Sequence, residues 1–151
     1  MPTQFIDITR PWIEVVEKTG MTSTGVEYTV SQQTPDFVFR VTGIDFEAFD
    51  DDGAIIESDA SRGRFTLSMR KSGGANQTFM KAPTDMFALR RWSNQQGWPG
   101  LRLVPRDKID YTFVVTQHNT TNLDLTSFGV RLLLMGYHEL VDPNEIKGRN
   151  I

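Results

Sequence analysis

The seven residues Arg64–Arg70, "RFTLSMR", alternate between polar and apolar side chains. Phe65, Leu67 and Met69 carry the apolar set. Successive side chains of a β-strand point to opposite faces, so a period of two predicts a strand with one buried face and one face in water.

The same alternation recurs before and after these residues. The expected inward sets are Val26, Tyr28 and Val30; Phe37, Phe39 and Val41; and Tyr111, Phe113 and Val115. Segment 127–140 differs, because it carries apolar residues on both faces. One face holds Phe128, Val130, Leu132 and Leu134, and the other holds Arg131, Leu133, Met135 and Tyr137. This pattern predicts a central strand, or a strand whose outer face is covered by another chain.

Turn signals separate the expected strands. Asp52-Gly53 predicts a hairpin turn between 44–49 and 54–57, with a positive φ at Gly53. Gly136 predicts a bulge or a close backbone approach. Helix is scarce: we expect Thr84 to cap one short helix near residues 85–92, and Gly97 to end it.

These patterns predict an all-β fold. About seven to nine strands at this spacing are typical of a β-sandwich, here expected to be jelly-roll-like. We expect residues 1–151 to form a single domain with short extended termini at 1–4 and 142–151.

Residues 96–105, "QGWPGLRLVP", predict a stiff elbow. Pro99 holds Trp98 extended, and Gly100 allows a tight bend. A short edge strand should then run over 101–104 until Pro105, which lacks a backbone N–H, stops it. The elbow either buries Trp98 or presents it to a partner.

Composition excludes several classes of protein. The chain has no cysteine, which excludes disulfides and thiolate metal sites. The N-terminus shows no signal-peptide pattern, and no apolar run is long enough to span a membrane, so we expect no membrane partner. A net charge of −3 argues against a nucleic-acid partner.

The sequence also lacks a signature of catalysis, and we expect neither an enzyme nor a cofactor. His118 and His138 are isolated, and no serine lies in a nucleophile-elbow pattern. The acidic stretch "FDDDGAIIESD" does not fit an EF-hand loop, because the first ligand position falls on Ala48 and the last on Asp59 rather than Glu. We expect an exposed hairpin tip there and no metal.

Charges are segregated along the chain. Segment 45–59 holds seven acidic and no basic residues, whereas 62–108 holds ten basic residues and two acidic ones. Two interpretations stay open: solvated strand faces, or a bipolar surface that docks on a complementary neighbour.

Tryptophans beside arginines are the residue types enriched at interface hot spots. They also plug the ends of sandwich cores, or stack on sugars. The candidate interface residues are Trp12, Arg90, Arg91, Trp92, Trp98, Pro99, Arg102, Asp50, Asp51 and Asp52.

Segment 65–137 resembles small jelly-roll structural proteins of tailed bacteriophages. The resemblance rests on "RFTLSMRKSGG", "FMKAPTDMFALRRW" with Pro83 inside it, "WPGLRLVPRDKIDYTFVV" and the closing "FGVRLLLMGYHEL". The last contains the aliphatic-x-Gly-aromatic ending Leu134-Met135-Gly136-Tyr137.

This resemblance implies a non-enzymatic part of a virion, assembled in the host cytoplasm. The expected role is a capsid decoration (cement) protein, a homo-oligomer that binds the major capsid protein or other virion proteins. One alternative is a head–tail connector, collar or tail-associated structural protein. Another is a carbohydrate- or receptor-binding module that uses Trp92 and Trp98 as platforms.

Overall fold

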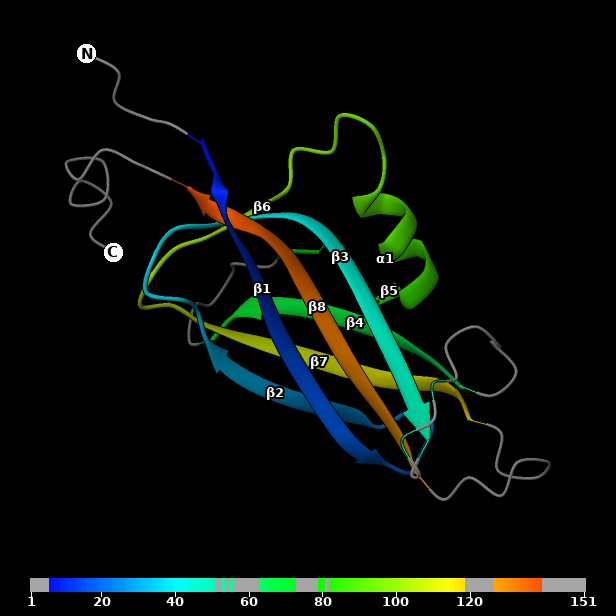
Figure 1. Cartoon of the computed structure of the whole chain (residues 1–151). Helices are drawn as coiled ribbons and strands as arrows, with labels where there is room; N and C mark the ends of the chain where they lie inside the picture. The colour runs from blue at the N-terminus through cyan, green and yellow to red at the C-terminus, as the bar shows by residue number, and fades with distance from the viewer. Residues whose placement is uncertain are drawn as a thin grey trace, which may run out of the picture.

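A computed structural model describes residues 6–50, 53, 55, 63–72, 79–80, 82–118 and 127–139, with backbone only at 6–9 and 118. Within them, two four-stranded antiparallel sheets pack face to face (Figure 1). The β1 sheet has the order β1 (Ile6–Met21), β8 (Phe128–Glu139), β3 (Phe39–Asp50) and β6 (Leu101–Leu103). The β2 sheet has the order β2 (Glu27–Gln33), β7 (Lys108–His118), β4 (Gly63–Lys71) and β5 (Thr84–Asp85). The predicted all-β sandwich with one short helix, α1 (Met86–Ser93), is confirmed.

Three of the expected inward sets form the core between the sheets. The buried side chains include Phe65, Leu67 and Met69 of β4, Tyr111, Phe113 and Val115 of β7, and Phe128, Val130, Leu132 and Leu134 of β8. Burial of each such side chain contributes about 1.5–3 kcal/mol. Val26 was wrongly placed inward. It precedes β2, just after a turn at Gly25 (φ 78°), and its side chain is 46% exposed.

β3 contains a bulge that the sequence pattern hid. Val41 lies opposite Gly136 of β8 and Gly43 lies opposite Met135, so Thr42 is an extra residue. The extra residue moves the buried set from odd positions (Phe39, Val41) to even ones (Ile44, Phe46, Ala48). What looked like two strands, 37–41 and 44–49, is therefore one long strand.

The bulge brings two backbones very close. A Cβ built on Gly136 would lie 1.8 Å from the carbonyl oxygen of Arg40. The close approach predicted at Gly136 is confirmed. β8 lies between β1 and β3, so its prediction as a central strand is also confirmed.

No strand was expected at residues 6–21, yet they form the longest described strand, β1. Its side chains do not follow a clean alternation. Val16 and Met21 are buried, whereas Ile13 and Val15 are exposed on the other face. Apolar residues at both odd and even positions hid the period of two.

α1 is capped by Asp85 and not by Thr84 as expected. The Asp85 carboxylate accepts a hydrogen bond from the backbone N–H of Phe87 at 3.1 Å, which satisfies one free N–H of the first turn. Thr84 instead lies in β5, and its hydroxyl donates to the carbonyl of Ala82. The helix ends at Asn94 rather than at Gly97.

α1 also covers an edge of the β1 sheet. β6 pairs with β3 only over Phe39–Val41. Just beyond, the buried Ser93 hydroxyl of α1 accepts from the N–H of Ile44 and donates to its carbonyl, at 3.0 and 3.1 Å. The helix thereby satisfies backbone groups that β6 leaves unpaired.

The expected elbow is present between α1 and β6. Gly97 (φ 81°) lies in a turn closed by a hydrogen bond from the N–H of Trp98 to the carbonyl of Gln95. Gly100 also has a φ of 81°, and a Cβ there would lie 2.3 Å from the carbonyl oxygen of Val41. At the other predicted turn, Gly53 has the expected positive φ, and Ile55 pairs with Phe49.

Candidate interaction surface

The residues predicted for an interface do not form one cluster. Trp12 lies on β1, at one edge of the β1 sheet, whereas Trp98, Pro99 and Arg102 lie at or beside β6, at the opposite edge. Asp50 lies at the end of β3. Asp51 and Asp52 lie outside the described residues.

Trp92 and Trp98 pack against each other beside α1. Their ring centroids are 5.1 Å apart, with planes inclined by 69°. Both rings are half-buried and pack against the core. Trp98, in the connection between α1 and β6, therefore packs against Trp92 and the core. Pro99 at the bend is exposed, and its carbonyl accepts from Arg40.

Part of the segregated charge is paired inside the chain. The guanidinium of Arg90 lies 2.7 Å from Asp45 and stacks 4.1 Å from the ring centre of Phe46. Asp45 belongs to the acidic segment and Arg90 to the basic one, so the two segments meet within one molecule. Arg91, the neighbour of Arg90, is exposed.

Arg102 is drawn into the fold as well. Its Nε lies 3.4 Å from Glu139 at the end of β8, and Arg40 of β3 approaches the same carboxylate at 3.1 Å. About four fifths of the Arg102 and Glu139 side chains are shielded from solvent. This arrangement ties β6 and β3 to the last described residue of β8.

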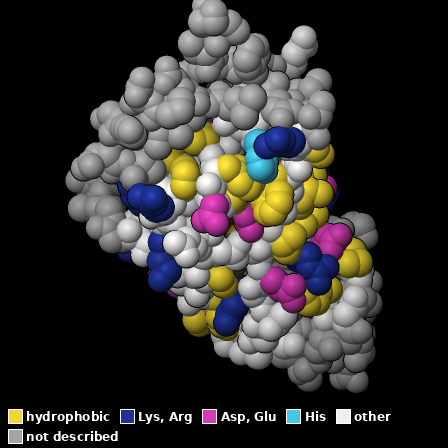
Figure 2. All heavy atoms as spheres, turned by 60° about the vertical axis from the view of Figure 1, so that its left-hand side comes forward, with side chains coloured by type: hydrophobic (Ala, Val, Ile, Leu, Met, Phe, Trp, Pro, Cys, Tyr) yellow, Lys and Arg dark blue, Asp and Glu magenta, His cyan; other side chains and the backbone are white. Residues whose placement is uncertain are grey.

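The outer face of the β1 sheet carries an exposed apolar patch. Ile13 (58% exposed) and Val15 (41%) of β1 lie directly opposite Met135 and Leu133 of β8. We call these four residues the apolar band. Figure 2 shows hydrophobic side chains gathered on the part of the surface that includes the edge at β1. Contiguous apolar side chains in water are typical of a protein-contact surface.

An ion-pair network borders the apolar band. Arg131 of β8 lies 2.8 Å from Glu47 of β3 and 3.3 Å from Glu17 of β1. Hydrogen bonds to Glu47 and Glu17 raise the pKa of Arg131 above its usual value. An apolar centre with a charged border is the usual composition of a protein–protein interface.

Half of the apolar band was predictable from the sequence. The two-faced pattern of 127–140 pointed to Leu133 and Met135. Ile13 and Val15 were missed, because they become neighbours of β8 only when the two ends of the chain pair.

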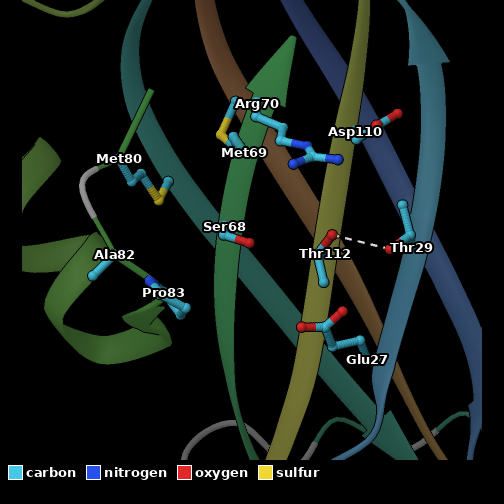
Figure 3. Close-up of a pocket in the computed structure, with 10 residues that line it drawn as sticks. All are labelled: Glu27, Thr29, Ser68, Met69, Arg70, Met80, Ala82, Pro83, Asp110 and Thr112. Carbon is cyan, nitrogen blue, oxygen red and sulfur yellow. Dashed lines mark hydrogen bonds between the residues drawn. The ribbon is translucent and has the colours of Figure 1, made fainter. Parts of the chain in front are cut away.

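A polar groove lies on the outer face of the β2 sheet (Figure 3). It has a volume of about 310 Å³, with hydroxyl groups on its floor and Met80 and Pro83 on one side. Thr29 and Thr112 share a hydrogen bond of 3.0 Å across β2 and β7. Asp110 of β7 accepts from Ser31 at 2.6 Å. These pairs tie neighbouring strands together, so much of the floor serves the sheet itself.

The two histidines differ in how much of them is described. His138 stacks on Phe37 with ring centroids 3.4 Å apart, and the side chain of His118 lies outside the described residues. Among the residues that the structure describes, no group of three His, Asp or Glu side chains is placed to hold a metal ion. α1, the one helix of that same part, is too short to cross a membrane.

No protein-family model, curated protein or solved structure matches this chain.

Proposed function

We propose that this chain is a non-enzymatic structural protein that binds an assembled bacteriophage shell and reinforces it, as a decoration or cement protein. The observation that carries the proposal is the apolar band on the outer face of the β1 sheet. It supplies an apolar surface, with Ile13 and Val15 open to a partner.

The strand pairing supports a jelly roll as the finer description of the sandwich. β1 pairs with β8, β2 with β7, β3 with β6 and β4 with β5, all antiparallel. The first four strands therefore pair with the last four in reverse order, as in a long hairpin rolled into two sheets. Jelly rolls serve as viral capsid proteins, lectins and cupins, so the fold leaves the function to the surface.

The chemistry of the apolar band favours a protein partner over a sugar. Ile13, Val15, Leu133 and Met135 offer no side-chain hydrogen bond, and a sugar hydroxyl buried against them would lose its bond to water. An apolar protein surface has no such hydrogen bond to lose, and its burial against the band is favourable. The resemblance of segment 65–137 to small phage structural proteins supplies the class of partner: the major capsid protein or another virion protein.

Copy number and position in the intact particle test the proposal. Cryo-electron microscopy should find hundreds of copies at local symmetry axes, with the β1 sheet facing the shell. Six or twelve copies at one vertex would instead identify a connector or collar protein. Absence from the particle would overturn the virion assignment altogether.

A further inference from the structure

A shallow pocket of about 420 Å³ opens at the edge of the sandwich beside β1. It lies between β1 and the segment 34–38 that joins β2 to β3. Trp12 and Glu14 line it from β1, and Gln33, Asp36 and Phe37 line it from the other side. Figure 2 shows acidic side chains next to hydrophobic ones on this side of the molecule.

An exposed tryptophan packs against a second aromatic ring at this pocket. Trp12 is 40% exposed, and its ring meets the ring of Phe37 edge to face, with centroids 5.2 Å apart. Phe37 is itself stacked on His138. The indole Nε1–H donates to Glu14 at 3.3 Å. Of the three tryptophans, Trp12 is the most open to solvent, since Trp92 and Trp98 are half-buried.

The lining carries two negative charges and no positive one. Glu14 accepts from Trp12 with one oxygen and from Gln32 with the other, both at 3.3 Å. Asp36 is exposed, and it makes no hydrogen bond or ion pair with the residues that the structure describes. No lysine or arginine lines the pocket.

We propose that this pocket receives an arginine side chain of the partner protein. A guanidinium is planar and stacks on an aromatic face, and its N–H groups fork onto carboxylates. Here the indole of Trp12 is the face, and Asp36 and Glu14 are the carboxylates. Ile13 follows Trp12 directly in β1, so its side chain lies on the opposite face of the strand and the pocket and the apolar band flank β1 from two sides. This inference rests on the proposed role as a protein-binding module.

The test uses the isolated full chain and a small probe, acetyl-Gly-Arg-Gly-amide. A matched peptide carries citrulline, which has the shape of arginine without its charge. Each of the three tryptophans gives one indole N–H signal in a ¹H–¹⁵N NMR spectrum, and Trp12→Leu identifies the signal of Trp12. We expect the arginine peptide to shift that signal at millimolar concentration and the citrulline peptide to leave it unchanged.

Two variants show whether charge drives the binding. Asp36→Asn should weaken binding of the arginine peptide by at least about threefold, since it removes the carboxylate that has no partner among the described residues. Glu27→Gln is the matched control, because Glu27 is also exposed but lies on β2 in the polar groove. It should leave the affinity unchanged.

Three results would overturn the inference: an equal response to citrulline, no effect of Asp36→Asn, or no shift by either peptide. A shift caused by maltohexaose, cellohexaose or chitohexaose in place of the arginine peptide would make Trp12 a sugar platform. The experiment needs no virion, so its failure leaves the shell-binding proposal standing. Equally, if the protein were absent from the particle, an arginine site measured with the peptide would still stand.

Discussion

At the scale of single residues, Asp85 joins three parts of the molecule. It pairs with Thr66 of β4 through β5, caps α1, and holds the guanidinium of Arg64 at 2.6 and 2.9 Å. Arg64 also lies 5.2 Å from the ring centre of Phe87. One carboxylate thus fixes where the helix starts and how it sits on the β2 sheet.

Replacing this cap should be costly, whereas replacing the residue expected to be the cap should not. Asp85→Ala is expected to lower the free energy of unfolding by about 1–2 kcal/mol, because it removes the acceptor for the N–H of Phe87. Thr84→Ala should cost less than about 0.5 kcal/mol. Urea denaturation at neutral pH measures both. A larger loss in Thr84→Ala would contradict the assignment of the cap.

The same carboxylate should make stability depend on pH. Partial burial opposes ionisation of Asp85, but hydrogen bonds from Arg64 and Phe87 outweigh it and lower its pKa below the ordinary 3.8. A carboxyl whose pKa is lower in the folded protein than in the unfolded chain stabilises the fold at pH values above its unfolded-state pKa. This stabilisation is lost as the pH falls towards the folded-state pKa. Asp85→Asn should therefore lose less stability than the wild type between about pH 5 and pH 2. Because Arg64 is 39% exposed, we expect the difference to be about 1 kcal/mol or less. Parallel pH profiles would argue against this role.

Gly136 and Gly43 provide a matched pair on neighbouring strands. A Cβ at Gly136 would clash with the backbone of Arg40, which cannot move without opening the pairing of β3 and β8. Gly136→Ala should therefore cost about 3 kcal/mol or prevent folding. A Cβ at Gly43 would meet only the flexible end of Met135, at 3.4 Å. Gly43→Ala should change the free energy of unfolding by less than about 1 kcal/mol. Equal effects in thermal unfolding would contradict this account.

At the scale of elements, β3 shows how one residue sets the phase of a strand. Before Thr42, the odd-numbered residues of β3 are buried, and after it the even-numbered residues are buried. Deleting Thr42 would force either Phe39 and Val41 or Ile44 and Phe46 out of the core. We expect the deletion to abolish the cooperative thermal transition.

A deletion elsewhere serves as the control for Thr42. Thr24 lies in the exposed connection between β1 and β2, outside both strands. Removing it should lower the melting temperature but leave a cooperative transition, followed by near-UV circular dichroism. Similar behaviour of the two deletions would mean that the bulge is not required for the core.

The alternating strands were predictable from sequence because a single face of each is buried. Phe65, Leu67 and Met69 keep one phase throughout β4, so a period of two was enough. β3 was split because the bulge at Thr42 reverses its phase. β1 was missed because its exposed face is apolar at Ile13 and Val15, so the contrast between faces is lost.

The candidate surface was less accessible to sequence reasoning, for a different physical reason. The apolar band exists only where Ile13 meets Met135, and that pairing joins opposite ends of the chain. The pocket at Trp12 likewise needs Asp36 beside β1. Residue types had marked Trp12 as an interface candidate, but which tryptophan stays open depends on tertiary packing.

At the scale of the whole molecule, the pairing of charges within the chain favours the apolar band over the charged segments as the proposed contact surface. Asp45 pairs with Arg90, and Glu47 pairs with Arg131, so part of the acidic segment is neutralised internally. A docking scheme based on the acidic and basic segments alone would have to break such pairs. The β1 sheet offers a contact that breaks none.

The chain contains its own control for a test of this contact. Ile13 and Val15 lie in the apolar band, 58% and 41% exposed, whereas Ile55 and Val26 lie elsewhere, 50% and 46% exposed. Ile13→Thr with Val15→Thr should leave the fold intact, since threonine suits a strand and surface changes cost within about 0.5 kcal/mol. Ile55→Thr with Val26→Thr makes the same chemical change outside the band.

The two double variants should differ in their affinity for particles from which this protein has been removed. Loss of about 1 kcal/mol of apolar burial at each site predicts that the band variant binds about tenfold or more weakly. The control variant should bind as the wild type does. If the protein reinforces the shell, particles that carry the control should resist heat as well as particles that carry the wild type. Particles mixed with the band variant should break at the same temperature as particles that carry none of this protein. Equal binding by both variants would place the contact on another face of the molecule. If the wild type binds to the particles but does not raise the temperature at which they break, the protein attaches to the shell without reinforcing it.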